Sequence, residues 1–293
     1  MRRVIQYDIE HEEESVLSFL RRRGYSRHVI IQLKKMYRSI VADGEWVRVN
    51  EPLHPGQRLT ISYEEKESSD GIIPVKGNLN IVYEDEDIIV VNKPADVPVH
   101  PSQGNYTNTL ANALAYYYAV RGESFVFRCI NRLDRDTTGL LVLARHGISA
   151  CGLSAQMKNH EIKREYQAVV TGRIPPAGCI AAPIARKEGS TIEREVDFAR
   201  GEYALTHYER IAVSQDYSLV RIRLETGRTH QIRVHMKYIG HPLPGDFLYC
   251  PVYRDFARQP LHSAALSFLH PVTGRRMSFQ AGLPEDMTGF FGG

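Results

Sequence analysis

The pattern of apolar and polar positions in the first 64 residues predicts two short amphipathic helices followed by short strands. Residues 12–23 carry apolar side chains on one helical stripe, and Ser26 is a good N-cap for a second amphipathic helix. Asp43–Gly44 has the composition of a hairpin turn, and 58–63 has the pattern of a further strand. We therefore predict a small α/β unit over residues 1–64.

The rest of the chain is dominated by strand-like runs. A polar stretch at 64–71 contains no apolar side chain and predicts a linker over 65–78. The predicted strands beyond it are 79–83, 88–92, 139–145, 164–172, 203–213 and 218–225. The predicted helices are 109–120, 146–160 and 229–238. Because the helices do not alternate regularly with the strands, we predict an α+β fold for residues 79–293, with a mixed, mostly antiparallel sheet and flanking helices.

Positive charge is concentrated near the amino terminus. The whole chain has a formal net charge of only +3. Between residues 16 and 63, however, basic residues far outnumber the acidic Asp43, Glu45 and Glu51. Such a local excess favours an anionic partner such as RNA. The residues predicted to contact it are Arg22, Arg23, Arg27, Lys34 and Lys35.

Several functional classes have no support in the sequence. The cysteines show no metal-ligand or redox spacing, and the histidines lack the H-E-x-x-H pattern. There is no phosphate-binding loop, no dinucleotide fingerprint and no apolar run of the roughly 18 residues that cross a membrane. Met1-Arg2-Arg3 is not followed by the apolar segment of a secretory signal. We therefore predict a cytoplasmic protein with no metal, no small-molecule cofactor and no membrane segment.

The densest group of polar and charged residues is the segment 129–139, C-I-N-R-L-D-R-D-T-T-G. It lies between a strand-like run and the apolar Leu140–Leu143, where a rigid sheet can hold catalytic groups on a loop. A solvated hairpin loop has a similar composition. The segment by itself leaves both interpretations open.

Two further segments have residues suited to chemistry. In 225–235, a glycine and a potential cap precede a short helix, so that backbone N–H groups and cations converge on a place suited to an anion. A capped amphipathic helix with Ile232 and Met236 inward is an equal alternative. In 163–168, Tyr166 could stack on a base or exchange a proton, although a tyrosine in a strand is more often half-buried packing.

Taken in order, these segments resemble the RluA-type family of pseudouridine synthases. The family's central motif, H-R-L-D-x-x-T-S-G, is matched by 131–139, and its later motif, G-R-x-H-Q-I-R-x-H, by 227–235. Shorter family signatures are matched at 92–94, 99–101, 163–168, 261–263 and 270–274. The resemblance spans 79–284 and is specific because several motifs occur in register. Two positions depart from the pattern, with Asn131 in place of histidine and Thr138 in place of serine.

The resemblance implies an isomerase that detaches uracil from ribose and rejoins it through carbon, without a cofactor. Asp134 would be the catalytic carboxylate, which either attacks the anomeric carbon or removes the neighbouring sugar proton. Arg228 would be the cation that keeps Asp134 charged, and Tyr166 would pack against the uracil or take the proton from carbon 5. Arg132 would enter the space that a flipped-out uridine leaves in the RNA stack. The other substrate contacts that the resemblance implies are Leu133, Thr137, His230, Gln231, Arg233 and Lys93.

The amino-terminal unit is similar, more loosely, to the alpha-L RNA-binding module first named from a small-subunit ribosomal protein. The likeness lies in 16–20, 26–34 and 47–50. It implies a large structured RNA as partner, with ribosomal RNA favoured over transfer RNA, and a monomer as the simplest state. A catalytically silent RNA-binding protein of the same fold and a nucleoside hydrolase remain as alternatives.

Overall fold

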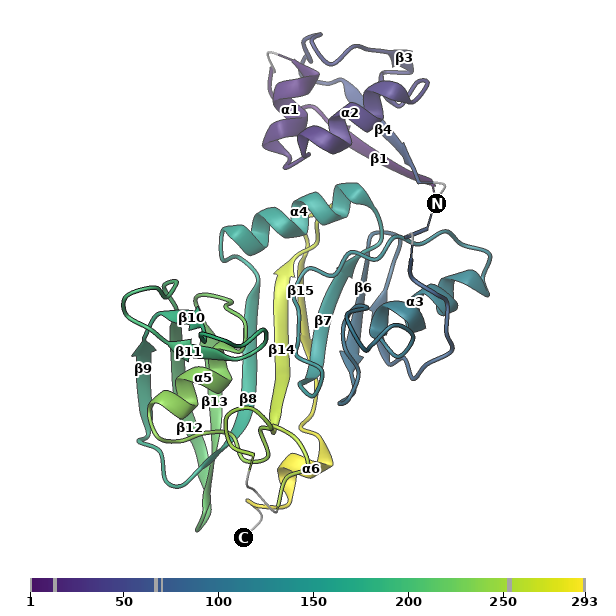
Figure 1. The fold of residues 1–293 in the computed structure, drawn as a ribbon. Coiled ribbons are helices and arrows are strands. Elements are labelled where there is room, and N and C mark those ends of the chain that lie inside the picture. Colours follow the sequence, from purple (N-terminus) through teal and green to yellow (C-terminus); the bar gives the residue numbers. More distant parts are fainter. Residues whose placement is uncertain (1, 13–14, 66–67, 70, 252–254, 292–293) are drawn as a thin grey trace.

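The computed structural model describes residues 2–12, 15–65, 68–69, 71–251 and 255–291, with a small amino-terminal unit beside a larger body (Figure 1). The small unit has a four-stranded antiparallel sheet in the order β1-β4-β2-β3 and two helices. Its elements are β1 (Arg2–Asp8), α1 (Val16–Arg22), α2 (Arg27–Lys35), β2 (Ile40–Ala42), β3 (Glu45–Trp46) and β4 (Arg58–Glu64). The predicted cap of α2 is confirmed, because the Oγ atom of Ser26 accepts a hydrogen bond from the Val29 N–H at 3.3 Å. Strand β1 was not predicted, since only Ile5 of its residues is buried and the amphipathic signal is weak.

The small unit packs against the body through an apolar contact. Ile148, at the start of α4 (Gly147–Lys158), is buried in the same cluster as Leu20 and Ile61 of the small unit. In Figure 1 the small unit correspondingly lies on the outer side of α4, away from the large sheet. The two sheets are therefore separate, but α4 contributes to the cores on both of its sides.

The described part of the predicted linker is bound to the body. The Ser69 N–H donates to the Phe125 carbonyl at 3.1 Å, and the Oγ atom of Ser68 accepts from the Phe125 N–H at 3.1 Å. The Oγ atom of Ser69 accepts from the Phe127 N–H at 2.8 Å. The polar side chains of Ser68 and Ser69 thus hydrogen-bond to the backbone of the body. Residues 66–67 and 70 of the predicted linker lie outside the described residues.

The body is built on a nine-stranded sheet in the order β5-β6-β7-β14-β8-β13-β12-β9, with β15 also paired to β14 (Figure 1). Its strands are β5 (Ile81–Glu84), β6 (Ile88–Lys93), β7 (Thr138–Ala144), β8 (Lys163–Thr171), β9 (Ala177–Ala181), β12 (Leu205–Val213), β13 (Tyr217–Leu224), β14 (Leu261–Leu269) and β15 (Arg276–Gln280). Every neighbouring pair is antiparallel except β7 and β14. The predicted α+β class with a mostly antiparallel sheet is confirmed.

Both faces of this sheet are covered. Ile89 of β6 and Leu141 of β7 lie in the cluster formed with α3 (Leu110–Ala119) and α5 (Gln231–Tyr238). The preceding residue of each strand lies in a second cluster, with α4 and β15. Strand β7 is buried along its whole length, which explains its continuous apolar run in place of an alternating pattern.

Several elements of the body were not predicted. They include β14, which lies between β7 and β8 in the middle of the sheet, and the hairpin of β10 (Ile184–Arg186) and β11 (Arg194–Val196). The short α6 (Glu285–Thr288) is another. Among the residues that the structure describes, no helix has the length and apolar composition needed to cross a bilayer.

Candidate active site

The central motif forms a loop that leads into β7. Gly139, at the end of the motif, has a φ of +109°, and a Cβ atom there would lie 2.3 Å from the carbonyl oxygen of Ser263 in β14. Glycine is needed because β7 and β14 approach each other closely at this point and the backbone is left-handed. The loop is therefore fixed to the centre of the sheet.

Two buried cations hold the loop backbone just after Asp134. The Lys93 ammonium, 1% exposed, donates to three backbone carbonyls, including that of Arg135 at 2.6 Å. The Nη1 atom of Arg258 donates to the carbonyl of Asp136 at 3.0 Å. The structure gives no support to the predicted substrate contact from Lys93, because its side chain is buried and donates to three carbonyls inside the protein.

Asp134 projects from this loop toward α5 and forms an ion pair there. Its Oδ2 atom accepts from the Nη1 atom of Arg233 at 2.8 Å. The other edge of the same guanidinium is held by Asp246, with Nε–Oδ2 at 2.6 Å and Nη2–Oδ1 at 2.8 Å. Asp246 is completely buried, whereas the Asp134 side chain is 30% exposed. One buried arginine thus binds two carboxylates, of which only Asp134 is open to solvent.

In the structure Asp134 pairs with Arg233 and not, as predicted, with Arg228, although Arg228 lines the same cavity. The Nη1 atom of Arg228 pairs with Glu202, and its Nε atom donates to the Tyr203 carbonyl at 3.0 Å. Both charged side chains are substantially exposed, at 39% and 70%. Arg228 precedes the turn into α5 and Arg233 lies within α5, so the helix directs only the second arginine at Asp134.

His230 begins α5 in a left-handed conformation, with φ 58° and ψ 17°. Its Nε2 atom lies 3.9 Å from the Oδ2 atom of Asp134, and its Nδ1 atom shares a hydrogen bond of 2.9 Å with the Tyr249 hydroxyl. Burial lowers the pKa of His230, so the ring is neutral near pH 7. Backbone strain of this kind in a non-glycine residue is often found at functional sites.

Gln231 braces the turn and has no free polar atom for the predicted substrate contact. Its side chain is 2% exposed. The Oε1 atom accepts from the Arg228 N–H at 2.9 Å, and the Nε2 atom donates to the Leu205 carbonyl at 3.0 Å. These bonds join the start of α5 to β12, so Gln231 supports Arg233 indirectly.

Tyr166 lies in β8 and forms part of the wall of a small cavity, of about 70 Å³, next to Asp134. The tyrosine is 4% exposed, and burial raises the pKa of its hydroxyl. Leu133 and Thr137 line the same cavity. Within the part of the chain that the structure describes, the buried Oγ1 atom of Thr137 has no hydrogen-bond partner.

The cavity adjoins a larger cleft of about 720 Å³ that Arg132, Asp134 and His230 also line. Arg132 is exposed, and it lines both the cavity and the cleft. The structure therefore brings together a carboxylate, a buried cation, a phenol and an exposed arginine around a hollow open to solvent. All the predicted catalytic and substrate-binding residues except Lys93 line this hollow: Arg132, Leu133, Asp134, Thr137, Tyr166, Arg228, His230, Gln231 and Arg233.

A family model described as RNA pseudouridylate synthase matches residues 87–238 of this chain. The chain belongs to the RNA pseudouridine synthase family. An uncharacterised RNA pseudouridine synthase of Bacillus subtilis is 40% identical over 266 residues, covering 90% of this chain and 94% of that protein. Ribosomal large subunit pseudouridine synthase D of Zymomonas mobilis is 45% identical over 230 residues, covering 71% of this chain and 70% of that protein.

Solved structures agree with this assignment. Human RNA pseudouridylate synthase domain containing 1 superposes with a TM-score of 0.59 at 27% identity, covering 70% of this chain and 83% of that one. The chain is thus an RNA isomerase of the RluA-type family, and RNA is its substrate.

The two departures from the family motif keep defined structural roles. The Oδ1 atom of Asn131 accepts from the Val142 N–H at 2.9 Å, and its Nδ2 atom donates to the Leu140 carbonyl at 3.3 Å. The Oγ1 atom of Thr138 shares a hydrogen bond of 2.8 Å with the Nδ1 atom of His262. Both side chains are buried, and both bind the loop to neighbouring strands.

Asp246 was missed by sequence reasoning. It belongs to no short motif, and a carboxylate that follows a helix is usually a surface residue. The signal in the sequence is the Gly245-Asp246 pair, and in the structure Gly245 has a φ of +71° and a Cβ atom there would lie 2.4 Å from the Phe256 carbonyl oxygen. The Gly–Asp pair therefore marks a tight turn that delivers the aspartate beneath Arg233.

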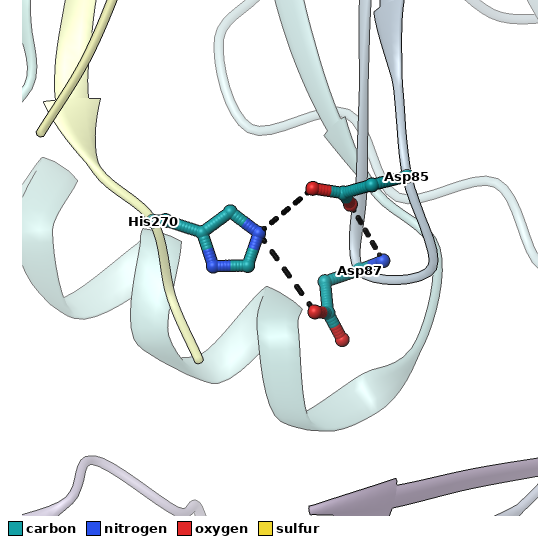
Figure 2. Close-up of side chains that lie close together, drawn as sticks. All are labelled: Asp85, Asp87 and His270. Carbon is teal, nitrogen blue, oxygen red and sulfur yellow. Dashed lines mark hydrogen bonds and ion pairs between the residues drawn. The ribbon is translucent and has the colours of Figure 1, made fainter. Parts of the chain in front are cut away.

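Asp85, Asp87 and His270 form the one group among the described residues whose donor atoms are close enough to hold a metal, within 4.8 Å of one another (Figure 2). These donors are already engaged. Asp87 receives two hydrogen bonds from Arg3, at 2.7 and 3.0 Å, and one of 2.8 Å with His146. Asp85 accepts backbone N–H groups in addition to His270. The cluster is best described as a polar link between the small unit and the body.

Proposed function

We propose that this protein converts uridine to pseudouridine in ribosomal RNA, with Asp134 as the catalytic carboxylate. The reaction breaks the bond between N1 of uracil and C1′ of ribose, turns the base and joins C5 to C1′. The observation that carries the proposal is the ion pair of Asp134 with Arg233, at 2.8 Å, beside the cavity that Tyr166 lines. This ion pair places the Asp134 carboxylate at the edge of that cavity.

Asp134 has to remain ionised when RNA covers the cleft. Burial of a carboxylate favours its neutral form, whereas a close cation favours the charged form. Burial would lower the pKa of Arg233, but the hydrogen bond and charge of Asp246 and the charge of Asp134 raise it overall. Arg233 therefore stays charged throughout the pH range of the reaction. Asp134 can then attack C1′ or remove the proton on C2′.

The uridine must leave its stack to reach Asp134, which costs a few kcal/mol in a duplex. Arg132 is exposed next to Asp134 at the boundary of the cleft and the small cavity. Its planar guanidinium can stack between bases in the space that the uridine vacates. Leu133, Thr137 and Tyr166 would then surround the uracil, and the unpaired Oγ1 atom of Thr137 is available to one of its polar edges.

The amino-terminal unit is proposed to bind RNA as an alpha-L-type module. We divide the chain into this module at 1–64, a connecting segment at 65–78 and the catalytic domain at 79–293. The predicted basic residues are all exposed, on α1, on α2 or in the turn between them. They are Arg22, Arg23, Arg27, Lys34 and Lys35. Contacts from them to phosphates would hold a large folded RNA over the cleft.

Ribosomal RNA is the favoured substrate because relatives such as the Zymomonas mobilis protein carry the name ribosomal large subunit pseudouridine synthase D. A transfer RNA is the runner-up. The protein would act as a monomer, since one chain supplies every residue proposed for the site, and it would act where ribosomes are assembled, in the cytoplasm.

The test is pseudouridine mapping of total RNA from cells that contain the native protein, the Asp134→Asn variant or neither. We expect pseudouridine at specific ribosomal positions only with the native protein. Sites in transfer RNA alone would replace the proposed substrate, and no new site at all would indicate a catalytically silent RNA-binding protein. Mass spectrometry of the treated RNA separates isomerisation, which leaves the mass unchanged, from hydrolysis, which creates abasic sites.

A further inference from the structure

A groove of about 930 Å³ adjoins the large cleft, and we call it the β8–β13 groove. Its walls include the loop before β8, the start of β8, the end of β13 and part of β14. Arg164 and Arg228 line both the cleft and the groove, and Arg228 also lines the small cavity beside Tyr166. The groove therefore begins within the length of one side chain from the place proposed for the uracil.

Positive charge predominates on the walls of the groove. The cationic wall residues are Lys163, Arg164, Arg223 and Arg228, and the acidic ones are Glu165 and Glu225. Both acidic side chains already have partners. Glu165 pairs with Arg221 and Arg223 at 3.1 Å, and Glu225 lies 2.6 Å from the Nε2 atom of His207. The groove is therefore suited to an anionic ligand that enters from the cleft.

Two of these cations have donors available for a phosphate. Arg164 forms no ion pair with a carboxylate in the described part of the chain, and its buried Nε atom has no hydrogen-bond partner there. Its terminal nitrogens lie 3.5 Å from the place that a Cβ atom on Gly227 would occupy, so the guanidinium packs against bare backbone. The exposed Lys163 ammonium donates to the His160 carbonyl at 2.9 Å, which uses one of its three donors.

The same groove has an apolar wall and an exposed aromatic ring. Ile162, Leu224 and Leu266 line it, and so does Tyr203, which is 61% exposed. The Tyr203 carbonyl accepts from the Nε atom of Arg228 at 3.0 Å, so its backbone is held beside that arginine. An exposed ring next to cations is the combination on which unstacked bases of single-stranded RNA are bound.

We propose that the β8–β13 groove holds the nucleotide next to the flipped-out uridine, with its phosphate on Arg164 and Lys163 and its base against the ring of Tyr203. The inference rests on the proposed function, because it starts from a uridine in the small cavity. Removing a uridine from a stack also removes a stacking partner of its neighbour. The groove replaces that partner by a protein ring, which favours the flipped-out arrangement of the RNA.

Filter binding of the mapped RNA over a series of salt concentrations tests both contacts. Tyr203→Ala should raise Kd by about fivefold or more, because the base loses the ring on which it stacks. Tyr203→Phe should keep the native Kd, since the ring remains. Lys163→Gln and Arg164→Gln should each reduce the slope of log Kd against log salt by about 0.7, the value for one phosphate contact on a single strand.

Tyr238→Ala and Lys76→Gln are the matched controls. Both residues are exposed and belong to the body, and neither lines the cleft, the groove or the small cavity. They should keep the native Kd and the native slope. A native Kd in Tyr203→Ala with native slopes in the two cation variants overturns the inference. Equal losses in the controls also overturn it, because the effect would then not belong to the groove.

A cross-linking experiment on the native protein does not depend on how the variants fold. The mapped RNA carries 4-thiouridine directly before or directly after the target uridine, and mass spectrometry identifies the cross-linked peptide after irradiation. From one of these two positions we expect a cross-link to Tyr203 or to residues 163–165. Cross-links from both positions that lie only elsewhere, on the opposite wall of the cleft or on the amino-terminal unit, contradict the inference.

Failure of the groove can be distinguished from failure of the proposed function. Pseudouridine at the mapped positions that disappears in Asp134→Asn, together with no cross-link in the groove, removes only the nucleotide site. Native turnover in Asp134→Asn, or no mapped position at all, ends the proposed function, and the groove loses its assigned ligand with it.

Discussion

The Nη1 atom of Arg233 lies 2.8 Å from the Oδ2 atom of Asp134, while the other two nitrogens of the same guanidinium are bound by Asp246. Arg233 is 2% exposed and cannot swing away to another partner. The aromatic rings of Phe247 and Tyr249 lie within 5.5 and 5.0 Å of its guanidinium carbon and enclose it further. The carboxylate that is open to solvent is thus positioned by a rigid, buried cation.

The first prediction compares the two arginines of the second motif. Arg233→Lys should lower kcat by at least tenfold more than Arg228→Lys does. A lysine at 233 loses the planar fork that binds two carboxylates at once, whereas exposed pairs such as Arg228–Glu202 contribute only about 0–1 kcal/mol. Single-turnover kinetics on the mapped RNA measures both variants. Equal losses, or a larger loss in Arg228→Lys, would show that Arg228 is the partner of Asp134 during the reaction.

The sequence motifs predicted which residues lie at the site, but they did not predict which partner each of these residues contacts. Arg228 and Arg233 belong to the same motif and lie on either side of the left-handed turn at His230, but only Arg233 pairs with Asp134. Hydrophobic patterning does not encode such a turn. Lys93 was predicted as a substrate contact for a similar reason, because a motif gives its position in the chain but not the three carbonyls around its ammonium.

Some strands of the sheet could be predicted from their own residues, whereas others form only because of the strands beside them. Strands with long β-branched or alternating runs, such as β6 and β13, were predicted from their own residues. Strand β14, L-H-S-A-A-L-S-F-L, has small and polar residues and gives no clear period. It is a strand because β7, β8 and β15 all pair with it. Its place in the centre of the sheet depends on residues more than 90 positions away.

The second prediction concerns the support of the catalytic loop by Lys93. Lys93→Met should leave three buried carbonyls without a donor and lower the free energy of unfolding by roughly 2–4 kcal/mol. For a chain of this size that corresponds to a decrease in Tm of several degrees. The rate should also fall, because the carbonyl of Arg135, next to Asp134, loses its anchor. Calorimetry and single-turnover kinetics test the two effects, and native values for both would contradict the anchoring role.

The third prediction concerns the link between the two units at Asp87. Burial would raise the pKa of Asp87, but hydrogen bonds from His146 and Arg3 outweigh burial and lower it below its ordinary value. A carboxyl with a lowered pKa stabilises the fold above about pH 4, and this contribution is lost as the pH falls through the folded-state pKa. Asp87→Asn should therefore lower Tm at pH 7 and make Tm less sensitive to acid between about pH 4 and pH 2.

Glu86→Gln is the control for this link. Glu86 also pairs with Arg3, at 2.7 Å, but its side chain is 74% exposed. Because exposed pairs contribute little, the variant should keep the native Tm and the native acid dependence. A larger effect from Glu86→Gln than from Asp87→Asn would show that the link depends on surface charge and not on the buried cluster of Figure 2.

The last prediction concerns the basic surface of the small unit. Lys34 and Lys35 are exposed at the end of α2, where phosphate contacts would release counterions from RNA. Replacing both with glutamine should weaken RNA binding and reduce the slope of log Kd against log salt by about one for each lysine. Arg58→Gln is the control, because Arg58 pairs with Asp8 at 2.8 Å on the sheet side of the same unit. A filter-binding series over salt concentration measures the slopes. An unchanged slope in the double variant, or an equal change in Arg58→Gln, would mean that α2 does not lie on the RNA and that the unit serves mainly as a packing partner for α4.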